Sequence, residues 1–181
     1  MRPIFTIHAG EFLAGDHINR KLGGKYDVWV PAKDSGVDLL VTRKRHRGRA
    51  VSLQVKFSRG FSIPKELAQH VIATSWFVVN PQKLRRSQAD LWVFVIITLS
   101  HEQHFVVIPK RELRKRIPRS CGKRWDLYLW VYNNRSCCQV RELSKSEKLD
   151  TINRGVRDRN HNFSEWLENW KLIDKYSKGS R

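Results

Sequence analysis

Acidic residues are scarce in this sequence, and their scarcity bounds what the protein binds. The 181 residues include 17 Asp and Glu against 35 Lys and Arg, which gives a formal net charge of +18 and an isoelectric point near 10.4. So large a charge destabilises a compact chain by self-repulsion, and we therefore expect a polyanionic partner. Nucleic acid is the first candidate and an anionic membrane surface the second.

Cysteines are also few, and they build neither a disulfide framework nor a zinc pattern. Cys121, Cys137 and Cys138 give an odd count without the spacing of metal-binding pairs. Such sparse usage is typical of a reducing compartment. Residues 1–6 are not followed by the apolar stretch of a signal peptide. We therefore expect a cytoplasmic protein, with association with the nucleoid included.

Long apolar runs are absent as well. The longest run, residues 91–99, is far short of the ~20 residues that a transmembrane helix requires. The chain also lacks a strongly basic amphipathic helix of the kind that lies on bilayers, so we expect no membrane partner. With 40% hydrophobic and 29% charged residues, the composition is globular. No linker or repeat divides the chain, which predicts one domain over residues 1–181.

Hydrophobic spacing predicts a chain of mixed α and β structure. A helix is expected over 9–22, a strand over 26–30 and a hairpin over 37–56. Further along we expect a loop at 57–62, a short helix at 64–73, strands at 76–79, 91–98, 104–108 and 125–132, and helices at 110–116 and 163–173. This order predicts an α/β (α+β) fold with a central mixed sheet flanked by helices.

The predicted hairpin over residues 36–56 gathers three different polar groups. Folding it about its charged loop places Asp38 roughly opposite Val55. Because successive strand side chains point to opposite faces, Gln54 and Lys56 share one face of the second strand. A carboxylate, an amide and an ammonium group therefore meet at the open end of the hairpin. This is the candidate site.

Short phrases around this site resemble the PD-(D/E)XK nuclease superfamily. They are Gly10-Glu11, Gly36-Val37-Asp38-Leu39-Leu40 and Leu53-Gln54-Val55-Lys56. The superfamily includes many restriction enzymes, archaeal Holliday-junction resolvases and repair nucleases. The resemblance is clear over residues 9–56 and looser beyond. It implies a restriction-endonuclease-like core at about 5–118, followed by a C-terminal strand and an amphipathic helix at about 125–176.

The resemblance implies a metal-dependent endonuclease that hydrolyses phosphodiester bonds in DNA, with Mg²⁺ or Mn²⁺ as cofactor. Asp38, Gln54, the Val55 carbonyl and Glu11 would hold the metal, and Lys56 would aid the attacking water. A hard divalent cation with oxygen ligands stabilises the charge that grows on the phosphoryl oxygens and acidifies a bound water. Many nucleases of this kind pair to cut both strands, so a homodimer is compatible with the resemblance.

Two positions depart from the family pattern. Val37 replaces the usual Pro, and Gln54 stands where most members carry Asp or Glu, although Gln occurs in active members, including a transposon-end cleaving subunit. An amide oxygen can ligate Mg²⁺ but adds no charge, so metal affinity should fall unless Glu11 makes up the deficit. The alternative is a catalytically inactive nucleic-acid-binding protein that retains the nuclease fold. A basic interaction or membrane-surface protein has only the charge in its favour.

Some assignments at the site have a second interpretation. Glu11 could simply be a first-turn acid that complements the helix dipole. Asp34, in a loop, is the second candidate for the role of Asp38.

Basic residues near the hairpin are the candidate DNA contacts. They are Arg43, Lys44, Arg45 and Arg47 in the charged loop, with Lys33 and Arg59 flanking the site in the sequence. The loop could also be a solvated hairpin tip or a localisation-like signal. We favour contact with phosphates beside the site.

Overall fold

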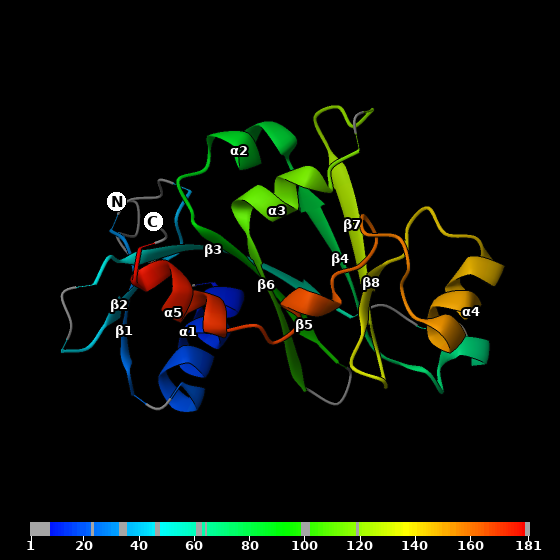
Figure 1. Cartoon of the computed structure of the whole chain (residues 1–181), viewed down its shortest axis with the longest axis horizontal. Coiled ribbons are helices and arrows are strands. Elements are labelled where there is room, and N and C mark those ends of the chain that lie inside the picture. Colours follow the sequence, from blue (N-terminus) through cyan, green and yellow to red (C-terminus); the bar gives the residue numbers. More distant parts are fainter. Residues whose placement is uncertain are drawn as a thin grey trace.

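Two β-sheets and the helices around them make up the computed structural model of the chain (Figure 1). The structure describes residues 8–22, 24–32, 36–45, 48–60, 63, 65–98, 102–118 and 120–179. The five-stranded sheet contains β1 (Tyr26–Trp29), β2 (Leu39–Arg43), β3 (Val51–Arg59), β5 (Leu91–Ile97) and β6 (Gln103–Pro109). The three-stranded sheet contains β4 (Val71–Val79), β7 (Trp125–Tyr132) and β8 (Cys137–Gln139).

Helices lie on both sides of the larger sheet and beside the smaller one. The larger sheet is flanked by α1 (Ala9–Lys21), α2 (Pro81–Arg86), α3 (Lys110–Lys115) and α5 (Lys171–Ser177). Helix α4 (Lys145–Arg154) and the 3-10 turn η1 (Lys65–Leu67) pack beside β7 and β8, and a second 3-10 turn is η2 (Ser164–Trp166). Among the described residues, no helix is both long and apolar enough to cross a membrane.

The larger sheet is mixed, as the sequence predicts. Its strand order is β1-β2-β3-β5-β6, and only the β3–β5 pair is parallel. A parallel pair needs a crossover connection, and here the connection carries β4 and α2. The prediction of an α+β chain with a mixed sheet flanked by helices is therefore confirmed.

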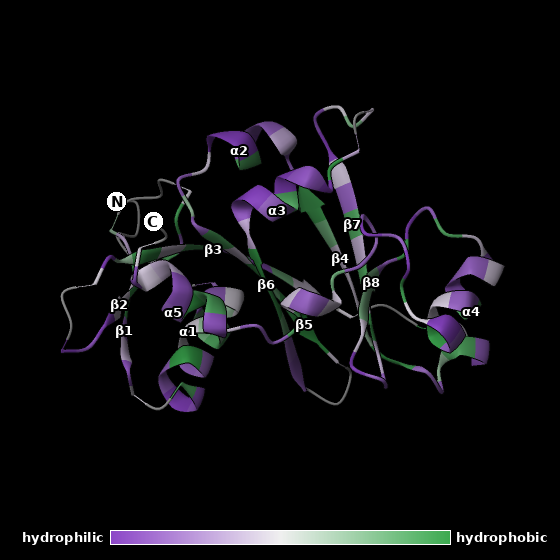
Figure 2. Cartoon of the chain, viewed as in Figure 1, coloured by the Kyte–Doolittle hydropathy of each residue, from purple (hydrophilic) through white to green (hydrophobic). Residues whose placement is uncertain are grey.

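The two faces of the larger sheet are covered by different layers. Leu53 and Val55 of β3 pack in one apolar cluster with Ile18 of α1 and Ile173 of α5. On the opposite face, Phe94 packs in a second cluster that includes residues of β4, β7, α2 and α3. Figure 2 shows α2 and α3 largely hydrophilic where they are not part of this core. The period-2 pattern of β3 is thus confirmed, with its alternate polar residues turned to the second face.

Two predicted segments around β3 and β4 are wrong. The loop expected at 57–62 is wrong over 57–59, because β3 stays paired with β5 as far as Arg59, and residues 61–62 lie outside the described residues. The helix expected at 64–73 is reduced to η1, and β4 already begins at Val71, five residues before the expected strand. Pairing with β7 along the whole of β4 decides this region, and such a long-range partner leaves no trace in local spacing.

The amphipathic helix expected over 163–173 is also wrong in form, although its apolar residues are buried. Phe163, Trp166 and Ile173 lie in the core, but η2 and α5 are separate. Between them Glu168 adopts a φ of 54°, and its N–H donates to the Phe105 carbonyl at 2.7 Å. Its carboxylate also accepts the Phe105 N–H at 2.8 Å. This clamp onto the edge strand β6 interrupts the helix.

Helix α4 and strand β8 were not predicted from the sequence. The α4 segment is polar, and it begins with a capping arrangement in which the Ser144 N–H donates to the Glu147 carboxylate at 2.7 Å. Strand β8 is only three residues long and pairs with β7.

A close approach between α1 and β3 fixes the position of the first helix. A Cβ atom added at Gly10 would lie 2.5 Å from the Cβ of Phe57, which is shorter than any ordinary contact. Glycine therefore lets the first turn of α1 rest directly on β3. The next residue, Glu11, is carried to the end of the sheet as a consequence.

We predict that Gly10→Ala destabilises the protein, because the added methyl group overpacks this contact, a change that costs about 1–3 kcal/mol. Gly15→Ala is the matched control in the same helix. A Cβ there would meet Val28 at 3.6 Å, an ordinary contact, so the better helix propensity of Ala should leave stability unchanged or raise it by up to about 1 kcal/mol. Urea unfolding of both variants measures the difference. Equal stabilities would contradict the close packing of α1 on β3.

Candidate active site

A cleft of about 830 Å³ collects the four residues that the sequence proposes as catalytic. Glu11, Asp38, Gln54 and Lys56 all line it, although they come from α1, the start of β2 and the middle of β3. Val55 lines it as well. The structure therefore brings together the whole predicted metal and catalytic set.

The hairpin register places Asp38 one residue away from its expected partner. Leu39 pairs with Leu53, and the Asp38 N–H donates to the Leu53 carbonyl at 2.8 Å. Continued by one residue, this register sets Asp38 opposite Gln54, and the expectation of Val55 is corrected. The difference arises because folding a loop about its middle cannot fix register to one residue.

The carboxylate of Asp38 bonds to β3 where β2 ends. One of its oxygens, Oδ2, accepts the Val55 N–H at 2.6 Å and a hydrogen bond from the side-chain amide of Gln54. In a strand, the N–H and C=O of one residue point to the same edge. The Val55 carbonyl therefore faces the edge on which the Asp38 carboxylate lies, in keeping with its predicted availability as a ligand.

Glu11 caps the N-terminus of its helix and lies at the cleft. The His8 N–H donates to its carboxylate at 3.1 Å, so Glu11 closes the N-terminus of α1. The same side chain lines the cleft. Its helix-capping role is thus shown, and its metal role stays a prediction.

Lys56 is held near a buried aromatic ring. Its Nζ lies 5.9 Å from the centroid of Trp92, within the range of a cation–π contact. Trp92 is itself part of the cleft wall, and among the described residues its buried indole N–H has no hydrogen-bond partner. The ammonium group is therefore directed along the wall of the cleft.

The structure adds two cations that sequence reasoning missed at the site. Lys83 and Arg86 of α2 line the cleft, and their spacing of three residues puts them on one side of the helix. The helix starts there because the Asn80 side chain accepts the N–H groups of Gln82 and Lys83, both at 2.9 Å. The basic run 83–86 was visible in the sequence. Its place beside Asp38 depends on the crossover from β3 to β5, which local spacing does not reveal.

Among the described residues of the hairpin loop, the lining of the cleft does not include Arg43, Lys44 or Arg45. Arg43 ends β2, five residues from Asp38, a separation of about 17 Å in an extended strand. Lys44 pairs with Asp27 at 3.5 Å, and Arg45 follows it in the turn. Contact between these residues and DNA stays a prediction.

Other predicted positions fall outside what the structure describes. They are Lys33, Asp34 and Arg47, together with the side chain of Arg59.

The donor groups in the cleft suit a hard divalent cation. Asp38 and Glu11 offer carboxylate oxygens, Gln54 an amide oxygen and Val55 a backbone carbonyl, and Mg²⁺ and Mn²⁺ prefer oxygen ligands of these kinds. Over the described ranges, no three His, Cys, Asp or Glu residues gather as a metal cluster. Among the described residues, two carboxylates line the cleft, so a metal held by these residues would take neutral oxygens as its other protein ligands.

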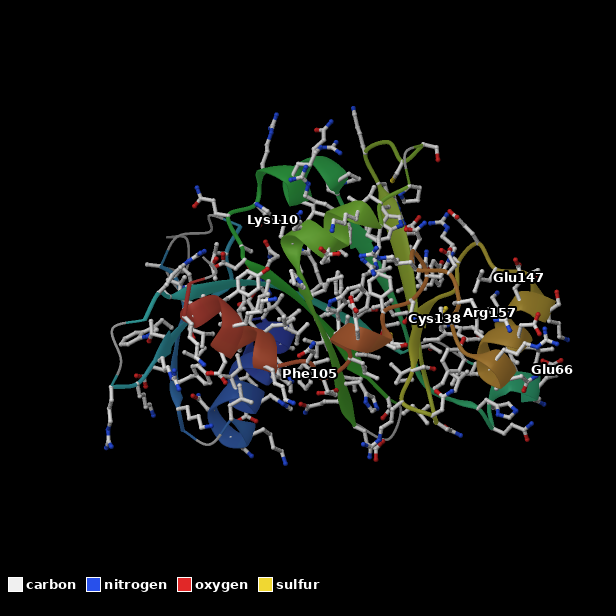
Figure 3. The ribbon with its side chains drawn as sticks, in the orientation of Figure 1. Glu66, Phe105, Lys110, Cys138, Glu147 and Arg157 are labelled. Atoms are coloured by element: carbon white, nitrogen blue, oxygen red, sulfur yellow. The ribbon has the colours of Figure 1, made fainter. Side chains whose placement is uncertain are left out.

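The two adjacent cysteines do not provide a competing reactive centre. Cys137 and Cys138 are fully buried on β8, and Figure 3 shows Cys138 in the interior of the ribbon. Burial raises the pKa of the Cys138 thiol to about 12 and that of Cys137 well above its ordinary value. Nucleophilic and metal-binding cysteines need the thiolate form, so these two serve packing.

No family model, no curated protein and no solved structure matches the chain. The comparisons therefore assign no function to this cleft, and the evidence for its function comes from the groups that line it.

Proposed function

We propose that the protein is a metal-dependent endonuclease that hydrolyses phosphodiester bonds in DNA, built on a restriction-endonuclease-like core. The observation that carries this proposal is the meeting of Glu11, Asp38, Gln54 and Lys56 in one cleft. The hairpin of β2 and β3 accounts for the closeness of Asp38, Gln54 and Lys56. Glu11 reaches the same cleft from α1, as the resemblance to PD-(D/E)XK nucleases implies.

The residues of the cleft have distinct parts in the proposed reaction. Asp38, Glu11, Gln54 and the Val55 carbonyl would hold the cation, which when bound supplies a Lewis acid to the phosphodiester. Lys56 is placed to orient the attacking water or to neutralise charge on the phosphate. Its contact with Trp92 limits the directions that its ammonium group can take.

The charge in the cleft favours a phosphate ligand. Lys56, Lys83 and Arg86 bring three positive charges against the carboxylates of Glu11 and Asp38. Cationic side chains bind phosphate oxygens through charge-assisted hydrogen bonds. The overall charge of +18 would add long-range attraction for a polyanion such as DNA.

The hydrogen bond between Gln54 and Asp38 favours a second candidate function. In this contact Gln54 turns its amide NH2 group, rather than its oxygen, toward the Asp38 carboxylate. A nucleic-acid-binding protein that has lost catalysis would retain the same basic cleft. Cleavage and metal binding separate the two candidates.

We predict that Asp38→Ala and Lys56→Ala abolish DNA cleavage while leaving DNA binding largely intact. Loss of a positioned proton-transfer or charge-neutralising group costs about 10²- to 10⁴-fold in rate. The assay is cutting of supercoiled, single-stranded and branched DNA in Mg²⁺ and in Mn²⁺. Lys65→Ala is the control, since η1 lies near α4 at the other end of the molecule, where Figure 3 labels its neighbour Glu66. Wild-type protein that cuts none of these substrates would refute the nuclease proposal and leave the binding protein.

We also predict that Gln54→Glu tightens metal binding, because a carboxylate replaces a neutral oxygen donor. Calorimetric titration with Mn²⁺ and Mg²⁺ should show weaker binding by the wild type than by the variant. Asp38→Ala should remove binding in either background. An affinity that does not change with Gln54→Glu would mean that residue 54 does not contact the metal.

Removal of Lys83 or Arg86 should weaken binding to all DNA sequences alike. Each phosphate contact contributes about 0.9 to the slope of log affinity against log salt concentration. We therefore expect Lys83→Ala and Arg86→Ala each to lower that slope by about 1, as measured by fluorescence anisotropy over a salt series. The same series on Arg43→Ala and Arg45→Ala tests the hairpin tip. Unchanged slopes for both α2 variants would place the phosphate track elsewhere.

A further inference from the structure

An exposed tryptophan lies on the same face of the sheet as the candidate active site. Trp29, the last residue of β1, has 57% of its surface exposed. It pairs with Leu40 of β2, and Leu40 in turn pairs with Ser52 of β3. Directly paired residues point to the same face. The ring of Trp29 therefore lies on the face that also carries Gln54, two residues along β3.

The register places Trp29 near Asp38 along the hairpin. Asp38 and Thr42 lie two residues before and after Leu40, so they are the two diagonal neighbours of Trp29. Diagonal neighbours in an antiparallel pair are about 7–8 Å apart at the backbone. The indole ring lies toward Thr42 and therefore extends away from Asp38 along the same face of the sheet.

A hydrogen bond holds the indole ring in place. The Trp29 Nε1–H donates to the Thr42 hydroxyl at 2.9 Å. Thr42 lies two residues beyond Leu40 and so shares its face. The polar edge of the indole is therefore satisfied by the protein, and more than half of the side chain's surface stays open to solvent. A ring fixed in this way needs little ordering when it binds a flat partner.

Core packing does not account for this tryptophan. A side chain that keeps 57% of its surface exposed gains little from burial. Phe12 is equally exposed, at 60%, but it belongs to α1, which packs on the opposite face of the sheet. Of the two, only Trp29 shares a face of the larger sheet with the candidate active site, where Lys56 is available to contact a phosphate.

We propose that Trp29 is a base-stacking platform, and that the substrate presents an unpaired base on the face of the sheet that also carries the scissile phosphate. Single-stranded nucleic acid, or the single-stranded arm of a branched molecule, has free base faces that stack on aromatic side chains. The bases of a continuous duplex are stacked on one another. The position of the scissile phosphate rests on the proposed nuclease function, whereas the stacking itself does not.

Binding in the absence of metal tests the platform separately from catalysis. Fluorescence anisotropy in EDTA compares a labelled oligothymidine with a duplex of the same length. The variants are Trp29→Thr, which keeps a good strand-forming residue, Trp29→Phe, which keeps an aromatic ring, and Phe12→Ala as the exposed aromatic control. Circular dichroism confirms that each variant is folded.

We expect Trp29→Thr to weaken binding of the single strand by about 5- to 150-fold, the range for loss of one base–aromatic stack. Duplex binding should change by less than about twofold, and the salt slope should stay the same because no charge is removed. Trp29→Phe should retain most of the affinity, and Phe12→Ala should match the wild type.

Equal single-strand affinities of Trp29→Thr and the wild type would overturn the platform. So would equal losses for single strand and duplex. Neither result touches the nuclease proposal, which stands or falls on cleavage by the wild type and its loss in Asp38→Ala.

Discussion

The hydrogen bond from the Val55 N–H to the Asp38 carboxylate is the contact on which the site depends. Strand β2 pairs with β3 only as far as Leu53, so the Val55 N–H, which faces β2, finds no backbone partner there. The side chain of Asp38 takes that place at 2.6 Å. A buried amide left unsatisfied would cost about 1–3 kcal/mol. A carboxylate offers about four acceptor positions, so this structural duty does not exclude a metal on the same group.

The remaining groups are brought to Asp38 by contacts that each depend on one small residue or cap. Gly10 lets α1 lie against Phe57 and carries Glu11 to the sheet end. Asn80 caps α2 and so sets the helix that presents Lys83. Because α2 belongs to the crossover between the parallel strands β3 and β5, the basic side of the cleft is a direct result of the sheet topology.

Local patterns predicted the parts of the fold that depend on neighbours in the sequence. The hairpin of β2 and β3 follows from alternation, and with it the common face of Gln54 and Lys56. The length of β4 could not be predicted, because a short apolar run fits a helix as well as a strand. Its partner strand, β7, lies about 50 residues away in the sequence. The clamp of Glu168 on Phe105 is equally long-range. For the site, the sequence supplied its chemistry, but only the fold places Lys83, Arg86 and Trp29 around it.

For the proposed function, the charges of the cleft favour an order of binding in which DNA precedes the metal ion. With Gln54 in place of an acid, the described lining residues bring two carboxylates and three cations, so a divalent ion entering alone would meet no excess negative charge among them. A DNA phosphate brings that charge, and its oxygens are good ligands for Mg²⁺. The nucleic acid would then tighten a metal site that binds its ion only weakly by itself. Such a site couples metal binding to substrate binding. A base stacked on Trp29 would strengthen substrate binding and, through it, metal binding.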